Sequence, residues 1–109
     1  MSEAEFVQVS TATPEREQAV ALAKGAVQRR LAAGSQVIGP VVSVFWHLGE
    51  FGEREEWRLL LTTTWDRYPE LEKYLLEQHP WDNPEVIITL ILGGAERCLQ
   101  WIEDNASPA

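Results

Sequence analysis

The order of strand-like and helix-like segments is the feature of this sequence that most constrains its fold. The stretch FVQVS, residues 6–10, alternates apolar and polar side chains, as a strand with one covered face does. A helical pattern follows, then two strand-like runs joined as a hairpin, a second helical pattern, another strand-like run and a terminal helix. Strand–helix–strand repeated in this way is the arrangement of the ferredoxin-like β-α-β-β-α-β sandwich, in which helices cover one face of an antiparallel sheet. The sequence therefore predicts an α+β ferredoxin-like domain with an extra C-terminal helix.

Turn and capping residues give the expected boundaries of these elements. Pro14 opens the first helix, whose apolar spacing predicts about 20 residues ending at Gly34. Gly25 inside this helix is interpreted as a close approach to the sheet, and Gly39-Pro40 as a bend or bulge early in the second strand. The buried stripe of the first helix is expected at Val20, Ala23, Val27 and Leu31. The expected strands cover residues 6–10, 35–48, 56–65 and 85–94, residues 49–55 form a loose hairpin loop, and the later helices begin at Asp66 and Ala95.

Two of the strand-like runs are apolar on both faces. In a sandwich of this kind the second sheet face meets water, so each strand should alternate apolar and polar residues. The runs VIITLIL (residues 86–92) and LLL (residues 59–61) do not alternate. Each side chain left exposed would forfeit roughly 1.5–3 kcal/mol of burial free energy, and together they would form a patch unusual for a soluble monomer. We therefore expect another copy of the chain to cover the second face.

Length and charge limit the class of protein. The 109 residues suit one domain, expected over 1–109 with an ordered core at about 5–104. The 17 acidic and 9 basic residues give a net charge of −8, which disfavours nucleic-acid and membrane partners because phosphates are repelled. The N-terminus lacks the basic region of a signal peptide, and no run approaches the roughly 20 apolar residues of a membrane span, so a cytoplasmic protein is expected. Cys98 has no second cysteine to pair with, which excludes an internal disulfide, and it is interpreted as a small apolar residue on a helix.

Several motifs are similar to those of the CutA family of divalent-cation tolerance proteins. The most specific is HPWDNPE, residues 79–85, in which a histidine, two prolines and an acid have a fixed spacing. The other matching pieces are TATPE (11–15), RRLAAG (29–34), SVFWHLGE (43–50), Glu56, TTT (62–64) and CLQWI (98–102), so the resemblance covers about Phe6 to Ile102. The resemblance implies a ferredoxin-like fold assembled as a tight homotrimer, like that of the nitrogen-regulatory PII proteins. It also implies a role in tolerance of copper and other divalent ions, with no established enzymatic reaction.

The chain departs from the family pattern at positions that bear on metal binding. Family members often carry cysteines where this chain has Thr11 and Gly34, a tryptophan where it has His47, and a lysine where it has Thr62. Losing both thiols removes the strongest reason to expect Cu(I), a soft ion that prefers sulfur. The resemblance therefore leaves open whether metal binding is abolished or retuned in this chain.

The candidate site residues come from HPWDNPE and from the hairpin. His79 has two interpretations: a metal ligand or proton carrier near neutral pH, or a cap at the C-terminus of the second helix. The tryptophans suit a ligand cleft or a subunit seam, and the acids, both at strand starts, suit binding a partner group or fixing a turn. The candidate ligand or metal cleft comprises His79, Glu56, Glu85, His47, Trp81 and Trp46. Together the imidazoles and carboxylates would suit Cu(II) or Zn(II) if subunits bring them together.

Motifs for catalysis are missing from the sequence. There is no HExxH, no nucleophile–base pattern and no Gly-rich phosphate loop, since the acids of GEFGE (residues 49–53) would repel phosphate. The sequence therefore favours a non-enzymatic, trimeric CutA-like protein for divalent-cation tolerance or metal response. Two alternatives stay open: a PII-like trimer whose inter-subunit clefts hold a small organic ligand, and a trimer that scaffolds another protein.

Overall fold

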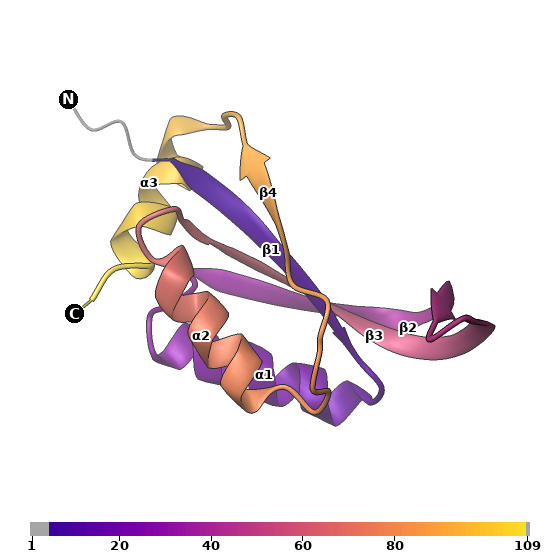
Figure 1. Cartoon of the computed structure of the whole chain (residues 1–109). Helices are drawn as coiled ribbons and strands as arrows, with labels where there is room; N and C mark the ends of the chain where they lie inside the picture. Colours follow the sequence, from indigo (N-terminus) through magenta and orange to yellow (C-terminus); the bar gives the residue numbers. More distant parts are fainter. Residues whose placement is uncertain (1–4, 109) are drawn as a thin grey trace.

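The computed structural model, which describes residues 5–108, contains a four-stranded antiparallel sheet and three helices (Figure 1). In chain order the elements are β1 (Phe6–Thr13), α1 (Arg16–Gln28), β2 (Gly34–His47), β3 (Glu50–Thr64), α2 (Tyr68–Gln78), β4 (Ile87–Ile91) and α3 (Glu96–Asn105). The strands lie in the order β2-β3-β1-β4 across the sheet. The predicted ferredoxin-like α+β fold with an extra C-terminal helix is confirmed. No helix within residues 5–108 is long and apolar enough to cross a membrane.

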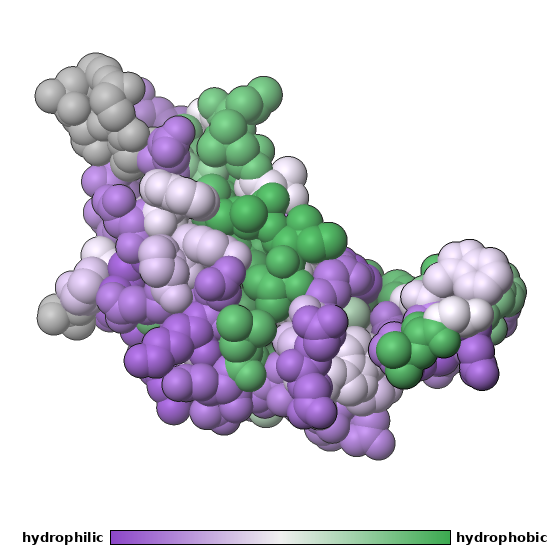
Figure 2. Space-filling view, viewed as in Figure 1, coloured by the Kyte–Doolittle hydropathy of each residue, from purple (hydrophilic) through white to green (hydrophobic). Residues whose placement is uncertain are grey.

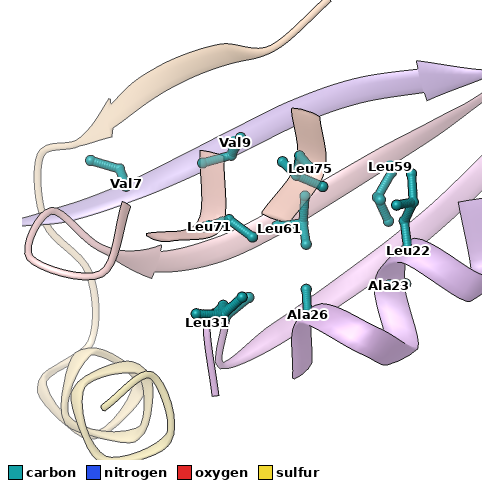
Figure 3. Close-up of a cluster of buried hydrophobic side chains, with 11 residues drawn as sticks. Val7, Val9, Leu22, Ala23, Ala26, Leu31, Leu59, Leu61, Leu71 and Leu75 are labelled. Carbon is teal, nitrogen blue, oxygen red and sulfur yellow. The ribbon is translucent and has the colours of Figure 1, made fainter. Parts of the chain in front are cut away.

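The core lies between one face of the sheet and the helices α1 and α2. Alternation along β1 and β3 places Val9 opposite Leu61 and directs both side chains toward these helices. Figure 3 shows side chains from both layers meeting there. The core side chains, each 4% exposed or less, include Val7, Val9, Leu22, Ala26, Leu59, Leu61, Leu71 and Leu75. This cluster packs α2 against the sheet, and the segment that follows α2 contributes to the candidate site.

The first helix is shorter than predicted. α1 has 13 residues and ends at Gln28, and Arg30 then takes a left-handed φ of 58°, which turns the chain toward β2. Gly34, predicted to end the helix, is instead the first residue of β2. Gly25 faces the Tyr74 hydroxyl of α2, and a Cβ at this position would collide with it. The predicted close approach therefore exists, but between two helices and not between helix and sheet.

The hairpin is longer and tighter than predicted. Its turn contains only Leu48 and Gly49, whose φ angles of 52° and 80° are those of a two-residue hairpin turn. Since β3 begins at Glu50, the expected loop over residues 49–55 is wrong. The predicted bulge at Gly39-Pro40 is confirmed by a register shift between Ile38 and Val41. Beyond this bulge, residues 41–56 form what we call the hairpin arm, which extends past α1 and α2 in Figure 1.

The third helix, α3, packs at one end of the opposite sheet face. Its residue Ile102 is buried in a small cluster with Phe6, whose side chain alternation directs away from α1 and α2. Cys98 lies on this helix, as interpreted from the sequence, and its side chain is exposed in the single chain.

Apolar side chains are exposed in two further regions, as Figure 2 shows along β4 and at the far end of the hairpin arm. On β4, Ile87 is 52% exposed and Leu90 is 53% exposed. On the hairpin arm, Trp46 and Phe51 are 74% and 64% exposed. These regions include the apolar run that led us to expect a covering copy of the chain. That copy stays a prediction.

Candidate functional site

A groove lies between the hairpin arm and the segment that connects α2 to β4. We call it the hairpin groove. Its volume is about 670 Å³. The wall on the arm comes from β2 and β3, and the other wall comes from residues 81–85. The lining residues are Ser43, Val44, Phe45, Trp46, His47, Arg54, Glu56, Trp81, Asp82, Asn83 and Glu85.

Glu56 is a buried carboxylate at the base of this groove, with 6% of the residue exposed. Ser43 Oγ donates a 2.7 Å hydrogen bond to Glu56 Oε1, and Arg54 Nε donates one of 2.7 Å to Oε2. Arg54 and Glu56 share a face of β3 because they are two residues apart, and Ser43 lies opposite Arg54 in the register. A buried carboxylate is costly unless its oxygens are hydrogen-bonded, and here each has a donor. Glu56 therefore positions Arg54.

The Arg54 guanidinium also contacts two aromatic rings. Its Cζ lies 4.9 Å from the ring centroid of Phe45 and 4.5 Å from that of Trp81. Both distances are within the range of a cation–π interaction. Phe45 belongs to the hairpin arm, whereas Trp81 follows α2, so Arg54 joins the two walls of the groove.

His79 connects the end of α2 to the end of β1. It caps α2, where its backbone N–H donates to Leu75 O at 2.9 Å. In the side chain, Nε2 lies 2.8 Å from Ala12 O and 3.1 Å from Thr11 Oγ1. Because a carbonyl only accepts, Nε2 carries the proton, and Nδ1 accepts the Trp81 backbone N–H at 3.1 Å. His79 thereby fixes the backbone of Trp81 beside the groove.

Burial favours the neutral form of this imidazole. It lowers the pKa of His79 below its usual 6.5, and the hydrogen bond to Ala12 O only partly opposes that effect. With Nε2 protonated and Nδ1 accepting, the neutral ring has no open lone pair for a metal ion. Within residues 5–108, no group of three or more His, Cys, Asp and Glu is placed to hold a metal ion. Of the two interpretations of His79, the single chain favours the structural one, although only the backbone caps α2 and the imidazole bonds instead to β1 and to Trp81.

Glu85 lies at the outer edge of the groove. Its Oε2 forms a 2.9 Å ion pair with Arg58 Nη2. The Glu85 side chain is 41% exposed and that of Arg58 is 29% exposed. An ion pair this exposed contributes little to stability. Of its two interpretations, Glu85 accordingly fits the fixing of a turn, since it holds the segment before β4 against β3.

The remaining candidates, Trp46 and His47, lie near the end of the hairpin arm. Trp46 packs edge-to-face on Phe51, with centroids 5.6 Å apart, and His47 pairs with Glu50 beside the turn. Both line the outer part of the groove. The groove thus includes Glu56, Glu85, Trp81, Trp46 and His47 of the predicted cleft, with His79 directly behind Trp81.

Sequence reasoning missed the residue at the centre of this arrangement, Arg54, and its contacts Ser43 and Phe45. A signal was present, because Arg54 and Glu56 share a strand face and opposite charges at that spacing can pair.

Two positions at which the chain departs from the family pattern are defined by the structure. Thr11 is buried in β1 against His79, and Gly34 lies against the Trp101 ring.

Comparisons with known proteins agree with this fold. The family described as CutA1 divalent ion tolerance protein matches residues 7–105. The divalent-cation tolerance protein CutA of Thermus thermophilus is 33% identical over 92 residues, covering 84% of this chain and 89% of that protein. A chloroplastic CutA protein of Arabidopsis thaliana is 30% identical over 97 residues, and the chain spans 53% of its length.

A solved structure gives the same result in three dimensions. The divalent cation tolerance protein Cut A1 from Thermus thermophilus superposes with a TM-score of 0.91 at 30% identity, covering 94% of this chain and 99% of that one. Fold, motifs and length therefore agree, and the chain belongs to the CutA1 divalent ion tolerance protein family.

Proposed function

We propose that this protein is a non-enzymatic homotrimer that acts in divalent-cation tolerance, with its ligand sites in grooves completed by neighbouring copies. The observation that carries the proposal is the exposed apolar surface of β4 and the hairpin arm. Ile87 and Leu90 on β4 and Trp46 and Phe51 on the arm are each more than half exposed, and clusters of exposed apolar side chains commonly mark protein–protein contacts. The three-fold assembly is the one that the family resemblance implies. A cytoplasmic location is part of the proposal, although the Arabidopsis relative is described as chloroplastic.

The shape of the chain supports assembly. The molecule measures 50 × 25 × 21 Å, and its long dimension includes the hairpin arm, which lies beyond its own helices. In a monomer, the exposed side chains of Trp46 and Phe51 would forfeit the favourable free energy of burial. β2 and β4 are the edge strands of the sheet, and an exposed edge pairs readily with another chain. Both features are accounted for if the arm lies across another copy.

Divalent ions would then be held by donors from more than one copy. His47 and Asp82 line the groove, and neither side chain has a hydrogen bond or ion pair within residues 5–108. An imidazole and a carboxylate suit Cu(II) or Zn(II), but two donors from one chain are too few for a closed site. His79 enters this proposal as a positioning residue for Trp81, not as a ligand.

Native mass spectrometry with and without added Cu(II) or Zn(II) tests the proposal. We expect a trimer that takes up ions in multiples of three, loses uptake in His47→Ala and keeps uptake in the matched variant His79→Gln. Uptake lost only in His79→Gln would restore His79 as the ligand. A monomer at micromolar concentration would contradict the assembly, and a trimer without specific uptake would contradict the metal role.

A second candidate function, binding of a small organic molecule, is favoured by the construction of the groove. Its volume of about 670 Å³ lies within the range of small-molecule sites, roughly 300–1,000 Å³. Aromatic side chains and one positioned guanidinium line it, which is the usual combination of apolar walls and a few oriented polar groups. Thermal stabilisation by an organic compound in the presence of a chelator would distinguish this function from metal binding.

A further inference from the structure

The guanidinium of Arg54 is positioned by the fold, yet its outer edge is open. Only Nε is hydrogen-bonded, to Glu56, and Cζ is held beside Phe45 and Trp81. Among the contacts within residues 5–108, Nη1 and Nη2 have no hydrogen-bond or ion-pair partner. The side chain is 48% exposed and lines the hairpin groove.

Another arginine of the chain shows that this arrangement is not general. Arg29 also lies over an aromatic ring, with Cζ 5.0 Å from the Tyr74 centroid, but its Nη1 donates to Gly25 O at 3.2 Å. It has no carboxylate partner within residues 5–108 and does not line the hairpin groove. Arg54 differs because a buried carboxylate holds its inner nitrogen while its outer pair of nitrogens is open to the groove.

We propose that the hairpin groove binds a small organic carboxylate, whose two oxygens accept hydrogen bonds from Nη1 and Nη2 of Arg54. Two parallel N–H donors in one plane match a carboxylate and give a bidentate pair. The aromatic side chains of Phe45, Trp46 and Trp81 would contact an apolar or aromatic body attached to that carboxylate. The inference rests on the second candidate function, since it names the ligand class of the same groove.

The charges around Arg54 favour a single carboxylate over a phosphate. Glu56 already balances the guanidinium, and Asp82 and Glu85, the latter paired with Arg58, add further negative charge to the lining. The whole chain carries −8, which disfavours a dianion more than a monoanion. Because Glu56 and the rings order Arg54 before a ligand arrives, little side-chain entropy is lost on binding.

Isothermal titration in the presence of EDTA tests the inference with three compounds of similar size. The probes are 3-phenylpropionate, 3-phenylpropanol and phenyl phosphate, and light scattering on the same sample records the oligomeric state. We expect saturable binding of 3-phenylpropionate that is about tenfold or more tighter than binding of either other probe, since only the carboxylate fits the planar donor pair without a second negative charge. Equal binding of the alcohol, or tighter binding of the phosphate, would overturn the carboxylate assignment.

Variants locate the binding at Arg54. Arg54→Lys keeps the positive charge but loses the two parallel N–H donors, so we expect binding to be about tenfold or more weaker. The control variant Arg29→Lys should bind like the wild type. Trp81→Leu should weaken binding by a smaller factor, because it removes an aromatic ring from one groove wall but leaves the two parallel donors of Arg54. Unchanged affinity in Arg54→Lys would overturn the inference. Binding of the carboxylate supports the inference whether the sample is a trimer or a monomer. A trimer that binds no carboxylate overturns the inference and leaves the proposed assembly unaffected.

Discussion

The two halves of the β2–β3 hairpin both contain apolar side chains on regular strands but place them in opposite environments. Near α1 and α2, Leu59 and Leu61 of β3 are completely buried. On the hairpin arm, Val42, Val44 and Phe51 are between 58% and 68% exposed, although they also lie on regular strands. The difference shows that one half of the hairpin stabilises the fold of a single chain, while within residues 5–108 these apolar residues of the other half are largely uncovered. In the homotrimer that we propose, the second half would serve assembly.

The largest effect is expected from the folding half. Leu71 and Leu76 lie on the same helix, α2, but Leu71 is completely buried and Leu76 is 50% exposed. Leu71→Ala should lower the free energy of unfolding by about 2–5 kcal/mol because it leaves a cavity. Leu76→Ala, the matched control, should cost about 1 kcal/mol or less. Urea unfolding at one protein concentration measures both, and equal losses would contradict the assignment of the core.

The next largest effect is expected from His79, whose contacts join the end of α2 to the end of β1 and lie outside the hairpin. His79→Ala removes the side-chain hydrogen bonds to Ala12 and Trp81 and should lower the free energy of unfolding by about 1–3 kcal/mol. His47→Ala, at an exposed position on the arm, should change it by less than about 0.5 kcal/mol. The same urea titration compares the two variants. A larger loss of unfolding free energy in His47→Ala than in His79→Ala would contradict a structural role for His79.

The pH dependence of stability tests whether the His79 imidazole is buried and neutral in the folded chain. Burial lowers the pKa of His79 in the folded chain, so the unfolded chain binds a proton that the folded chain excludes once the pH falls below about 6.5. Stability from this residue is fully present above that pH and is lost as the pH decreases toward the folded pKa. Unfolding at pH 7.5 and 5.5 should therefore show a smaller acid-induced loss in His79→Gln than in the wild type. An identical pH dependence in both proteins would contradict the neutral, buried imidazole.

The smallest effect is expected at the groove edge. Glu85→Gln breaks the ion pair with Arg58, whose side chains are 41% and 29% exposed. The free energy of unfolding should fall by less than about 1 kcal/mol, and less at high salt. Thermal unfolding at low and high ionic strength measures this difference. A large, salt-independent loss would mean that Glu85 has a buried partner.

The sequence was sufficient for the fold because its signals are local. Alternation identified β1, apolar runs indicated the other strands, Asp66 was expected to open α2 within two residues of its observed start, and Gly39-Pro40 marked the bulge. The loop predicted over residues 49–55 failed because glycines and acids usually indicate a turn, whereas here they continue β3 at an exposed edge of the arm. The first helix was extended too far because Leu31 keeps the helical spacing although the chain has already turned at Arg30.

The site was predictable only in part, because its contacts join distant segments. The motif of residues 79–85 directed attention to His79 and Trp81, and both lie at or directly behind the groove. Arg54 was missed because the Trp81 ring that it contacts is 27 positions away in the chain, and no periodicity reports such a pairing. The hydrogen bonds that occupy both ring nitrogens of His79 were also invisible, since they come from β1 and from the backbone of Trp81.

Sedimentation equilibrium of the wild type and of a Trp46→Ser/Phe51→Ser variant, over low to high micromolar concentration, tests the assignment of the hairpin arm most directly. We expect a trimer for the wild type, and for the variant a population shifted toward monomer with unchanged circular dichroism, because the substitutions lie outside the folded core. A wild-type monomer throughout this range, or a variant that assembles as well as the wild type, would contradict the role of the arm in assembly.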